Sequence, residues 1–363
     1  MTEPVVISRW DTRIAPAFAP GKDPLPSLES LECAERWLSR GVPIVIPTET
    51  VYGLAAPALD EAAVRAVFEI KGRPLDNPLI VHLTREEHLG RVGAVLSPLG
   101  KEFARRFWPG PLTLVVTTSA TLPWVTAGLD SVALRHPDHA FAAALIERVG
   151  PLAAPSANLS GRPSPTRAWH AARDLSGLVP LVIDGGDLEH GLESTVLDVR
   201  GATPVLLRPG ALPLEALQLA CAVPISTSTK DEAIRSPGMK YRHYSPRAEI
   251  WLYPALHAGS GPRARRLAED ASVLCSSGRR VAAIAQQPVN VERFIQQPAD
   301  LRELGRHLFG WLRELDELGV DCILIEGVSR TGVGRAIMDR LTRAASRVRD
   351  AAGDARLEQG SVS

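Results

Sequence analysis

The stretch from residue 47 to residue 82 limits what this chain can fold into more than any other part of its sequence. An apolar run at 42–46 leads into the polar sequence Pro-Thr-Glu-Thr-Val-Tyr-Gly-Leu at 47–54. A second apolar run at 79–83 follows the loop Lys-Gly-Arg-Pro-Leu-Asp-Asn-Pro at 71–78. Short apolar runs bounded by turn residues are typical of buried strands. We therefore predict two strands of an α/β fold, each adjoining a polar loop.

The two loops carry different kinds of polar side chain. Thr50 supplies a hydroxyl on the first loop, while Lys71, Arg73 and Asn77 supply an ammonium, a guanidinium and an amide on the second. Such donors are suited to binding phosphate and carboxylate groups together. The same residue types are also ordinary in solvated turns, and a cation at the end of a helix complements the helix dipole. From these residues alone, both interpretations stay open.

Length and charge bound the class of protein. A chain of 363 residues is long enough for two domains, each with its own core. Lys plus Arg and Asp plus Glu both number 41, so the overall charge favours neither a nucleic-acid coat nor an acidic tail. RNA binding would therefore need a local basic patch.

Cysteine spacing and hydropathy predict a cytoplasmic protein without a membrane partner. The 4 cysteines form no Cys-x-x-Cys pair that would make half of a zinc site, as expected of free thiols in a reducing compartment. Residues 1–20 lack the apolar core of a signal peptide, and no later apolar run approaches the length of a membrane span.

Polar groups recur at the ends of the strands predicted up to residue 210. Residues 1–26 hold a short apolar run at 5–7 and several prolines, which predicts an edge strand followed by a tether. Helices are predicted at 27–41, 61–70, 97–107 and 141–149, and strands at 112–117, 132–137, 181–186, 193–199 and 204–207. One site along one edge of a mixed sheet would explain this distribution.

The remainder of the chain reads as a linker and a second domain. A helix at 214–219 and a Ser/Thr/Pro-rich interval to 229 precede a segment at 236–246 that is too rich in aromatics and donors for a passive spacer. Strands at 249–253, 280–284 and 322–326 alternate with helices at 262–275 and 301–318, which predicts a small parallel sheet. A terminal helix is predicted at 334–348. The glycines at 332 and 334 before it would form a phosphate cradle or a plain tight turn.

A series of short motifs runs along the chain. The motifs are Pro-Thr-Glu-Thr-Val-Tyr-Gly-Leu at 47–54, Lys-Gly-Arg-Pro at 71–74, Asn-Pro-Leu-Ile-Val-His at 77–82, Phe-Trp-Pro-Gly-Pro-Leu-Thr at 107–113, Ala-Pro-Ser-Ala-Asn at 154–158, Glu-Ser-Thr-Val at 193–196, Arg-Pro-Gly at 208–210 and Ser-Pro-Gly-Met-Lys-Tyr-Arg-His-Tyr at 236–244. Each motif is weak alone, but their order is highly specific. With its motifs in this order, the chain resembles the threonylcarbamoyl-AMP synthases, in the long form that joins a YrdC-like catalytic domain to a smaller Rossmann-like domain. The match departs at Ala55, where the family commonly has Gly, which leaves the turn after Leu54 open.

The resemblance implies a fold and a domain plan. We expect a YrdC-like twisted mixed sheet with helices at 27–210, after an N-terminal tether and edge strand at 1–26. A linker and lid at 211–246 would lead to a Rossmann-like parallel-sheet domain at 247–350, followed by a tail at 351–363.

The resemblance also implies an activity. The family makes threonylcarbamoyl-AMP and pyrophosphate from L-threonine, bicarbonate or CO2, and ATP with Mg2+, for the threonylcarbamoyladenosine modification of tRNA. A downstream tRNA threonylcarbamoyl transferase is the expected protein partner. The carbamate of threonine would attack the α-phosphate, so the enzyme positions reactants and stabilises charge without a covalent nucleophile.

Site residues follow from the same motifs. The implied threonine site comprises Thr50, His82, Arg135, the Ala154 backbone and Ser194. The implied ATP site comprises Lys71, Arg73, Asn77, Ser131, Ser156, Asn158, Ser164, Arg208 and His243. Lys71, Arg73 and Arg208 would neutralise phosphates as the catalytic cations, and Tyr241, His243 and Tyr244 would belong to a lid over the nucleotide. The alternative for Arg135 is an internal salt bridge.

Two other classes compete with this activity. YrdC-like domains are also associated with double-stranded RNA, so a non-catalytic RNA-binding module, or weak RNA binding beside catalysis, is one alternative. The other is a carbamoyl-transfer enzyme, which ranks last because the zinc-finger cysteine pairs expected in such chains are absent from this sequence.

Overall fold

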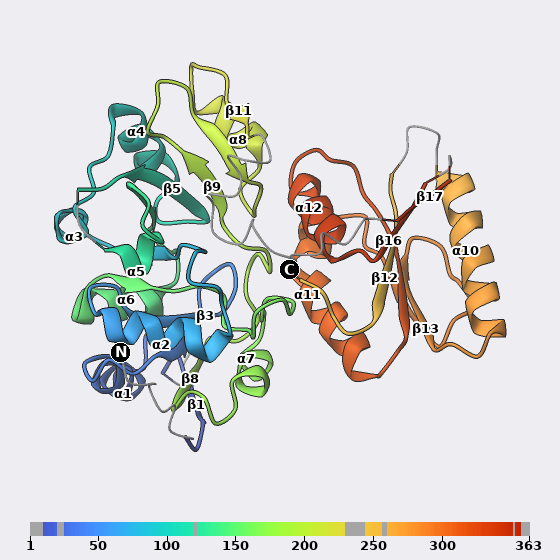
Figure 1. Cartoon of the computed structure of the whole chain (residues 1–363), viewed down its shortest axis with the longest axis horizontal. Helices are drawn as coiled ribbons and strands as arrows, with labels where there is room; N and C mark the ends of the chain where they lie inside the picture. The colour runs from blue at the N-terminus through green and yellow to red at the C-terminus, as the bar shows by residue number, and fades with distance from the viewer. Residues whose placement is uncertain are drawn as a thin grey trace. The chain divides into compact units, whose positions relative to one another are not determined.

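The computed structural model describes residues 10–19, 25–119, 122–228, 244–255, 260–350 and 353–356. The chain divides into two compact units, of which the first holds Met1–Ser160 with Ser164–Tyr241 and the second holds Gly161–Pro163 with Arg242–Ser363. In Figure 1 the first unit runs from blue to yellow, and most of the second runs from orange to red. The predicted strand at 5–7 and two predicted lid residues, Tyr241 and His243, lie outside the described residues.

The first unit is built on an 11-stranded mixed sheet of order β1-β8-β2-β3-β7-β4-β6-β5-β9-β10-β11. Its strands are β1 Arg13–Pro16, β2 Ile44–Ile46, β3 Gly53–Pro57, β4 Ile80–His82, β5 Leu112–Thr117, β6 Ser131–Arg135, β7 Leu152–Ala153, β8 Leu181–Asp184, β9 Thr195–Asp198, β10 Val205–Arg208 and β11 Ser226–Thr227. Its helices are α1 Leu28–Leu38, α2 Glu61–Lys71, α3 Glu86–Arg91, α4 Pro98–Phe107, α5 Pro123–Thr126, α6 Ala140–Val149, α7 Ala168–Asp174 and α8 Leu214–Leu219. An edge strand does precede residue 26, but it is β1, which pairs in parallel with β8.

Local capping fixes the helix that leads into the second polar loop. The Asp60 side chain accepts a hydrogen bond from the Ala63 backbone N–H and so caps the start of α2. At the other end Gly72 adopts the left-handed conformation, with φ of 60°, which stops the helix. Lys71 is therefore the last residue of α2, as its sequence predicts.

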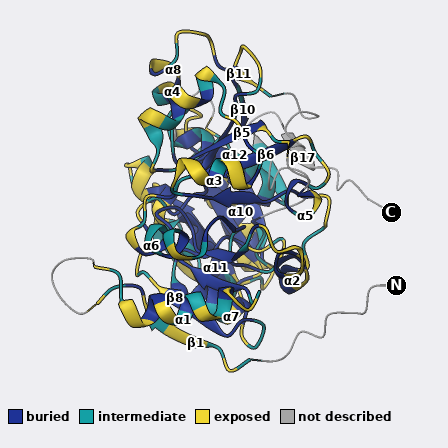
Figure 2. Ribbon diagram, turned by 90° about the vertical axis from the view of Figure 1, so that its left-hand side faces the viewer, coloured by how far each residue is buried: buried dark blue, intermediate teal, exposed yellow. Residues whose placement is uncertain are grey.

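The middle of the sheet is buried on both faces. Val45 and Leu54 belong to one core cluster, which includes residues of α2. Ile44, Ile46 and Ala55 belong to another cluster, which includes residues of α1 and α6. Adjacent residues of a strand point to opposite faces, so β2 and β3 contribute to both clusters and anchor the loop between them. Both strands are buried, except at Pro57, whereas β1 at the edge of the sheet is largely exposed (Figure 2).

The second unit carries a 6-stranded sheet of order β14-β13-β15-β12-β16-β17. Its elements are β12 Glu249–Tyr253, α10 Ser260–Ser276, β13 Val281–Ala285, β14 Arg293–Gln296, α11 Leu301–Glu317, β15 Cys322–Glu326, α12 Gly334–Ala344, β16 Arg347–Asp350 and β17 Gly353–Arg356. Every pairing is parallel except the last, because β17 runs antiparallel to β16. The predicted parallel sheet is thus confirmed, with one antiparallel strand at its edge.

The predicted terminal helix at 334–348 is wrong over its last residues. Helix α12 ends at Ala344, and Arg347 and Val348 pair in parallel with β12. The guanidinium carbons of Arg347 and Arg349 lie 4.7 and 4.9 Å from the centroid of the Trp251 ring. This cation–π stacking favours an extended strand, which places alternate side chains on one face. Within the described ranges, every helix is too short or too polar to span a bilayer.

Candidate active site

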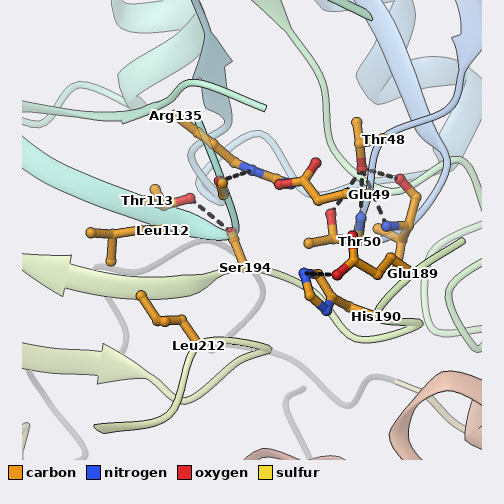
Figure 3. Close-up of polar contacts among 12 residues, drawn as sticks. Thr48, Glu49, Thr50, Leu112, Thr113, Arg135, Glu189, His190, Ser194 and Leu212 are labelled. Atoms are coloured by element: carbon orange, nitrogen blue, oxygen red, sulfur yellow. Dashed lines mark hydrogen bonds and ion pairs between the residues drawn. The ribbon is translucent and has the colours of Figure 1, made fainter. Parts of the chain in front are cut away.

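The first polar loop is held by its own hydroxyls. Thr48 Oγ1 donates to the Val51 carbonyl oxygen at 2.7 Å and lies 2.8 Å from Thr50 Oγ1. The same oxygen accepts weak hydrogen bonds from the backbone N–H groups of Thr50 and Val51, both at 3.3 Å. Both threonines are buried. The loop therefore has a fixed conformation, and the Thr50 hydroxyl has a fixed place within it (Figure 3).

Arg135, at the end of β6, forms a buried ion pair with Glu49 of this loop. Arg135 Nη2 lies 2.7 Å from Glu49 Oε1, and the two side chains are only 4% and 3% exposed (Figure 3). Arg135 Nε also donates to the Gly110 carbonyl at 3.3 Å. Burial alone would raise the pKa of Glu49, but the Arg135 guanidinium brings that pKa below its ordinary value. The internal salt bridge that the sequence left open is thus present in the structure.

His82 ends β4 and stands beside Arg135 in the parallel register of β4 and β6. Burial, assisted by the positive charge of Arg135, lowers the pKa of His82 to about 3. The imidazole is therefore neutral at physiological pH. Its Nδ1 atom has no hydrogen-bond partner among the described residues.

Ser194 begins the next polar cluster, just before β9. Its Oγ lies 2.8 Å from Oγ1 of Thr113, which pairs with Arg135 in the register of β5 and β6 (Figure 3). Arg208, the last residue of β10, donates through Nη2 to the Ser194 carbonyl at 2.9 Å and to its Oγ at 3.2 Å. Arg208 thus contacts the Ser194 hydroxyl directly, and Arg135 is paired with Thr113, which contacts the same hydroxyl.

The second polar loop is tied to a third loop by Lys71. Lys71 Nζ donates to the carbonyl oxygens of Ser156 and Asn158, each at 2.5 Å, and the side chain is buried. Arg73 instead closes its own loop, donating to the carbonyls of Asn77 at 3.2 Å and Pro78 at 2.9 Å. Both cations shape the backbone of the site.

The other predicted site residues are spread more widely. Ser164 Oγ donates to Glu193 Oε1 at 2.6 Å, and Ala154 directly follows β7. Ser131 and Arg135 occupy opposite ends of β6, about 13 Å apart at about 3.3 Å per residue. Tyr244 belongs to the second unit, where its ring stacks on Phe309 with centroids 5.2 Å apart.

Sequence reasoning missed three participants in these clusters, namely Glu49, Thr113 and Glu193. A signal for Glu49 was available, because a lone carboxylate between two hydroxyl residues in a strand-end loop is itself a polar candidate. Glu193 likewise directly precedes Ser194. Thr113 lies inside an apolar strand, and its sequence position does not distinguish it from a packing residue.

The first unit, a mixed sheet with buried arginines and hydroxyls at its strand ends, belongs to the Sua5/YciO/YrdC class, as its match to a family model shows. The family model for that class, described as "Telomere recombination", matches residues 36–210. A second model, described as "Threonylcarbamoyl-AMP synthase, C-terminal domain", matches residues 212–346.

Similar proteins extend over most of the chain. A threonylcarbamoyl-AMP synthase from Pyrococcus abyssi is 43% identical, over 86% of this chain and 93% of its own length. One from Bacillus subtilis is 42% identical, over 83% of this chain and 89% of its own. The crystal structure of P. abyssi Sua5 complexed with L-threonine superimposes with a TM-score of 0.85 at 39% identity, covering 93% of this chain and 99% of that one. The chain belongs to the threonylcarbamoyl-AMP synthase family, which confirms the resemblance, the predicted fold class and the predicted enzyme class.

Proposed function

We propose that this chain joins L-threonine, bicarbonate or CO2, and ATP into L-threonylcarbamoyl-AMP, with release of pyrophosphate. The observation that carries the proposal is the buried guanidinium of Arg135, set among hydroxyls at the strand ends of the first unit. A guanidinium is suited to a carboxylate, and the threonine-bound relative supports threonine as its source.

The proposed roles combine the clusters described above with the motifs of the sequence. Arg135 binds the threonine carboxylate, and Thr50, His82, the Ala154 backbone and Ser194 surround the rest of the amino acid. Lys71, Arg73 and Arg208 face the ATP phosphates as catalytic cations, and the remaining nucleotide contacts are assigned to Asn77, Ser131, Ser156, Asn158, Ser164 and His243. Tyr241, His243 and Tyr244 close over the nucleotide and exclude water from a hydrolysable acyl-adenylate.

The chemistry requires positioning more than it requires a reactive side chain. The carbamate oxygen of N-carboxythreonine attacks the α-phosphorus, and the bond to pyrophosphate breaks. Negative charge develops on phosphate oxygens, where fixed cations stabilise the transition state more than the ground state. Mg2+ enters as the ATP complex, held by the phosphates. Within the described residues, no group of three His, Cys, Asp or Glu side chains is placed to hold a metal ion.

The product is a mixed anhydride, so a second enzyme must accept it. We assign that step to a tRNA threonylcarbamoyl transferase in the cytoplasm, as part of tRNA modification. Direct RNA binding by this chain would be weak and would depend on local charge, since the overall charge is balanced.

The test is pyrophosphate release with each substrate left out in turn. We expect pyrophosphate only when ATP, Mg2+, threonine and bicarbonate are all present. Serine should support slower release, since the loss of one buried methyl group costs about 1 kcal/mol. Phosphate release without threonine would overturn the proposal. Salt-sensitive RNA binding in the absence of both substrates, with no pyrophosphate formed, would favour the RNA-binding module instead.

A further inference from the structure

The ion pair between Glu49 and Arg135 leaves hydrogen-bonding capacity unused inside the protein. The two groups are 2.7 Å apart, and beyond this contact neither Glu49 oxygen nor Arg135 Nη2 has a well-aligned hydrogen bond among the described residues. Buried charged groups that lack directed hydrogen bonds are costly and uncommon in native proteins. A ligand that supplies both a donor for Glu49 and an acceptor for Arg135 would remove this cost.

A zwitterionic amino acid is such a ligand. Its carboxylate and its ammonium group are attached to the same carbon, so they present opposite charges side by side. Glu49 and Arg135 present the complementary pair (Figure 3). The ammonium group carries three N–H donors, and the Glu49 carboxylate has two oxygens that accept them.

The surroundings of Glu49 favour a cation at this place. The lowered pKa of Glu49 keeps its carboxylate ionised at neutral pH. The neighbouring His82 is neutral, because burial lowers its pKa to about 3, and it adds no positive charge that would repel an ammonium group. Nδ1 of His82 is a further buried polar atom in the same cluster, and it has no hydrogen-bond partner among the described residues.

We infer that Glu49 binds the α-ammonium group of the amino-acid substrate while Arg135 binds its carboxylate. This inference rests on the proposed function and adds a residue to its substrate site. It leaves the hydroxyls of Thr50 and Ser194 for the side-chain hydroxyl of threonine. Because the nitrogen of the carbamate is neutral, Glu49 acts on threonine binding rather than on the later step at the α-phosphorus.

The test compares L-threonine with (2S,3R)-2,3-dihydroxybutanoate, in which a hydroxyl replaces the amine. Dissociation constants are measured by calorimetry on the full chain. The wild type should bind threonine about ten- to a hundredfold more tightly than the analogue, the range for a charge-assisted hydrogen bond. In Glu49→Gln this preference should fall to about threefold or less. The exposed Glu189, drawn in the same view, gives the matched control Glu189→Gln, which should keep the wild-type preference.

Loss of Glu49 also leaves Arg135 without its counter-ion, so Glu49→Gln is checked for folding by circular dichroism. If that variant does not fold, Glu49→Asp replaces it, because it keeps the charge but shortens the reach, and its preference should drop about tenfold. A preference that stays at the wild-type value in the folded variant overturns the inference. So do equal affinities of the wild type for the two ligands. A wild type that releases no pyrophosphate at all would instead refute the proposed function.

Discussion

Replacing Lys71 by Met separates two roles of this side chain. Met keeps most of the apolar stem and removes the ammonium, which donates to the Ser156 and Asn158 carbonyls at 2.5 Å each. A hydrogen bond from a charged donor is worth about 1.5–3 kcal/mol, and a buried carbonyl left unpaired costs about 1–3 kcal/mol. The Met side chain recovers part of this through its own packing. We therefore expect a net loss of about 3 kcal/mol in the free energy of unfolding.

For a unit of this size, a loss of about 3 kcal/mol corresponds to a fall in Tm of about 6–12 °C. Differential scanning calorimetry without ligands measures it directly. The control is Lys101→Met, because Lys101 lies exposed on α4 and should change Tm by less than about 2 °C. If Lys71→Met lost pyrophosphate release while its Tm stayed within about 2 °C of the wild type, Lys71 would not brace the two loops and would act on the nucleotide alone.

Three further perturbations test other parts of the structure. Arg73→Lys keeps the charge but loses the forked contact with its own loop, so the KM for ATP should rise about tenfold; an unaltered KM would show that the guanidinium geometry is not needed. Gly210→Ala places a Cβ in collision with the Thr195 backbone nitrogen and should destabilise the chain by about 1–3 kcal/mol in a urea melt, whereas wild-type stability would show that the backbone yields freely. Burial lowers the pKa of His82 to about 3 in the folded chain, whereas the imidazole has an ordinary pKa of about 6.5 in the unfolded chain. Between these two pKa values the unfolded chain binds more protons than the folded chain. The free energy of unfolding therefore falls as the pH falls. Between pH 7 and pH 5 the wild type should lose about 2 kcal/mol more than His82→Gln, and equal losses would contradict a buried neutral imidazole.

Local signals in the sequence were sufficient to place α2 and the residue at its end. Asp60 and Gly72 are strong start and stop signals, and both act within one turn of the helix that they bound. Lys71 could therefore be located from the sequence. Its contacts with Ser156 and Asn158 could not, because they depend on how distant loops meet.

The elements that the sequence did not reveal are those whose conformation depends on neighbouring strands. The run Gly-Leu-Ala-Ala-Pro of β3 lacks the β-branched and aromatic residues that mark strands, and it becomes a strand through antiparallel pairing with β2. The sequence of β16 continues the helical pattern of α12, and the stacking of its arginines on Trp251 favours a strand instead. The pairing of Glu49 with Arg135 is likewise a product of tertiary structure, since local patterns do not specify long-range partners.

The proposed reaction can be tested by the identity of its product. The purified chain is incubated with ATP, Mg2+, L-threonine and 13C-bicarbonate, and the nucleotides are resolved by mass spectrometry. We predict one new adenylate that contains threonine, AMP and a single 13C atom, formed in equal amount to pyrophosphate. An adenylate with threonine but without 13C would contradict the proposed reaction, because the α-phosphorus would then have been attacked by the amino acid itself and not by its carbamate.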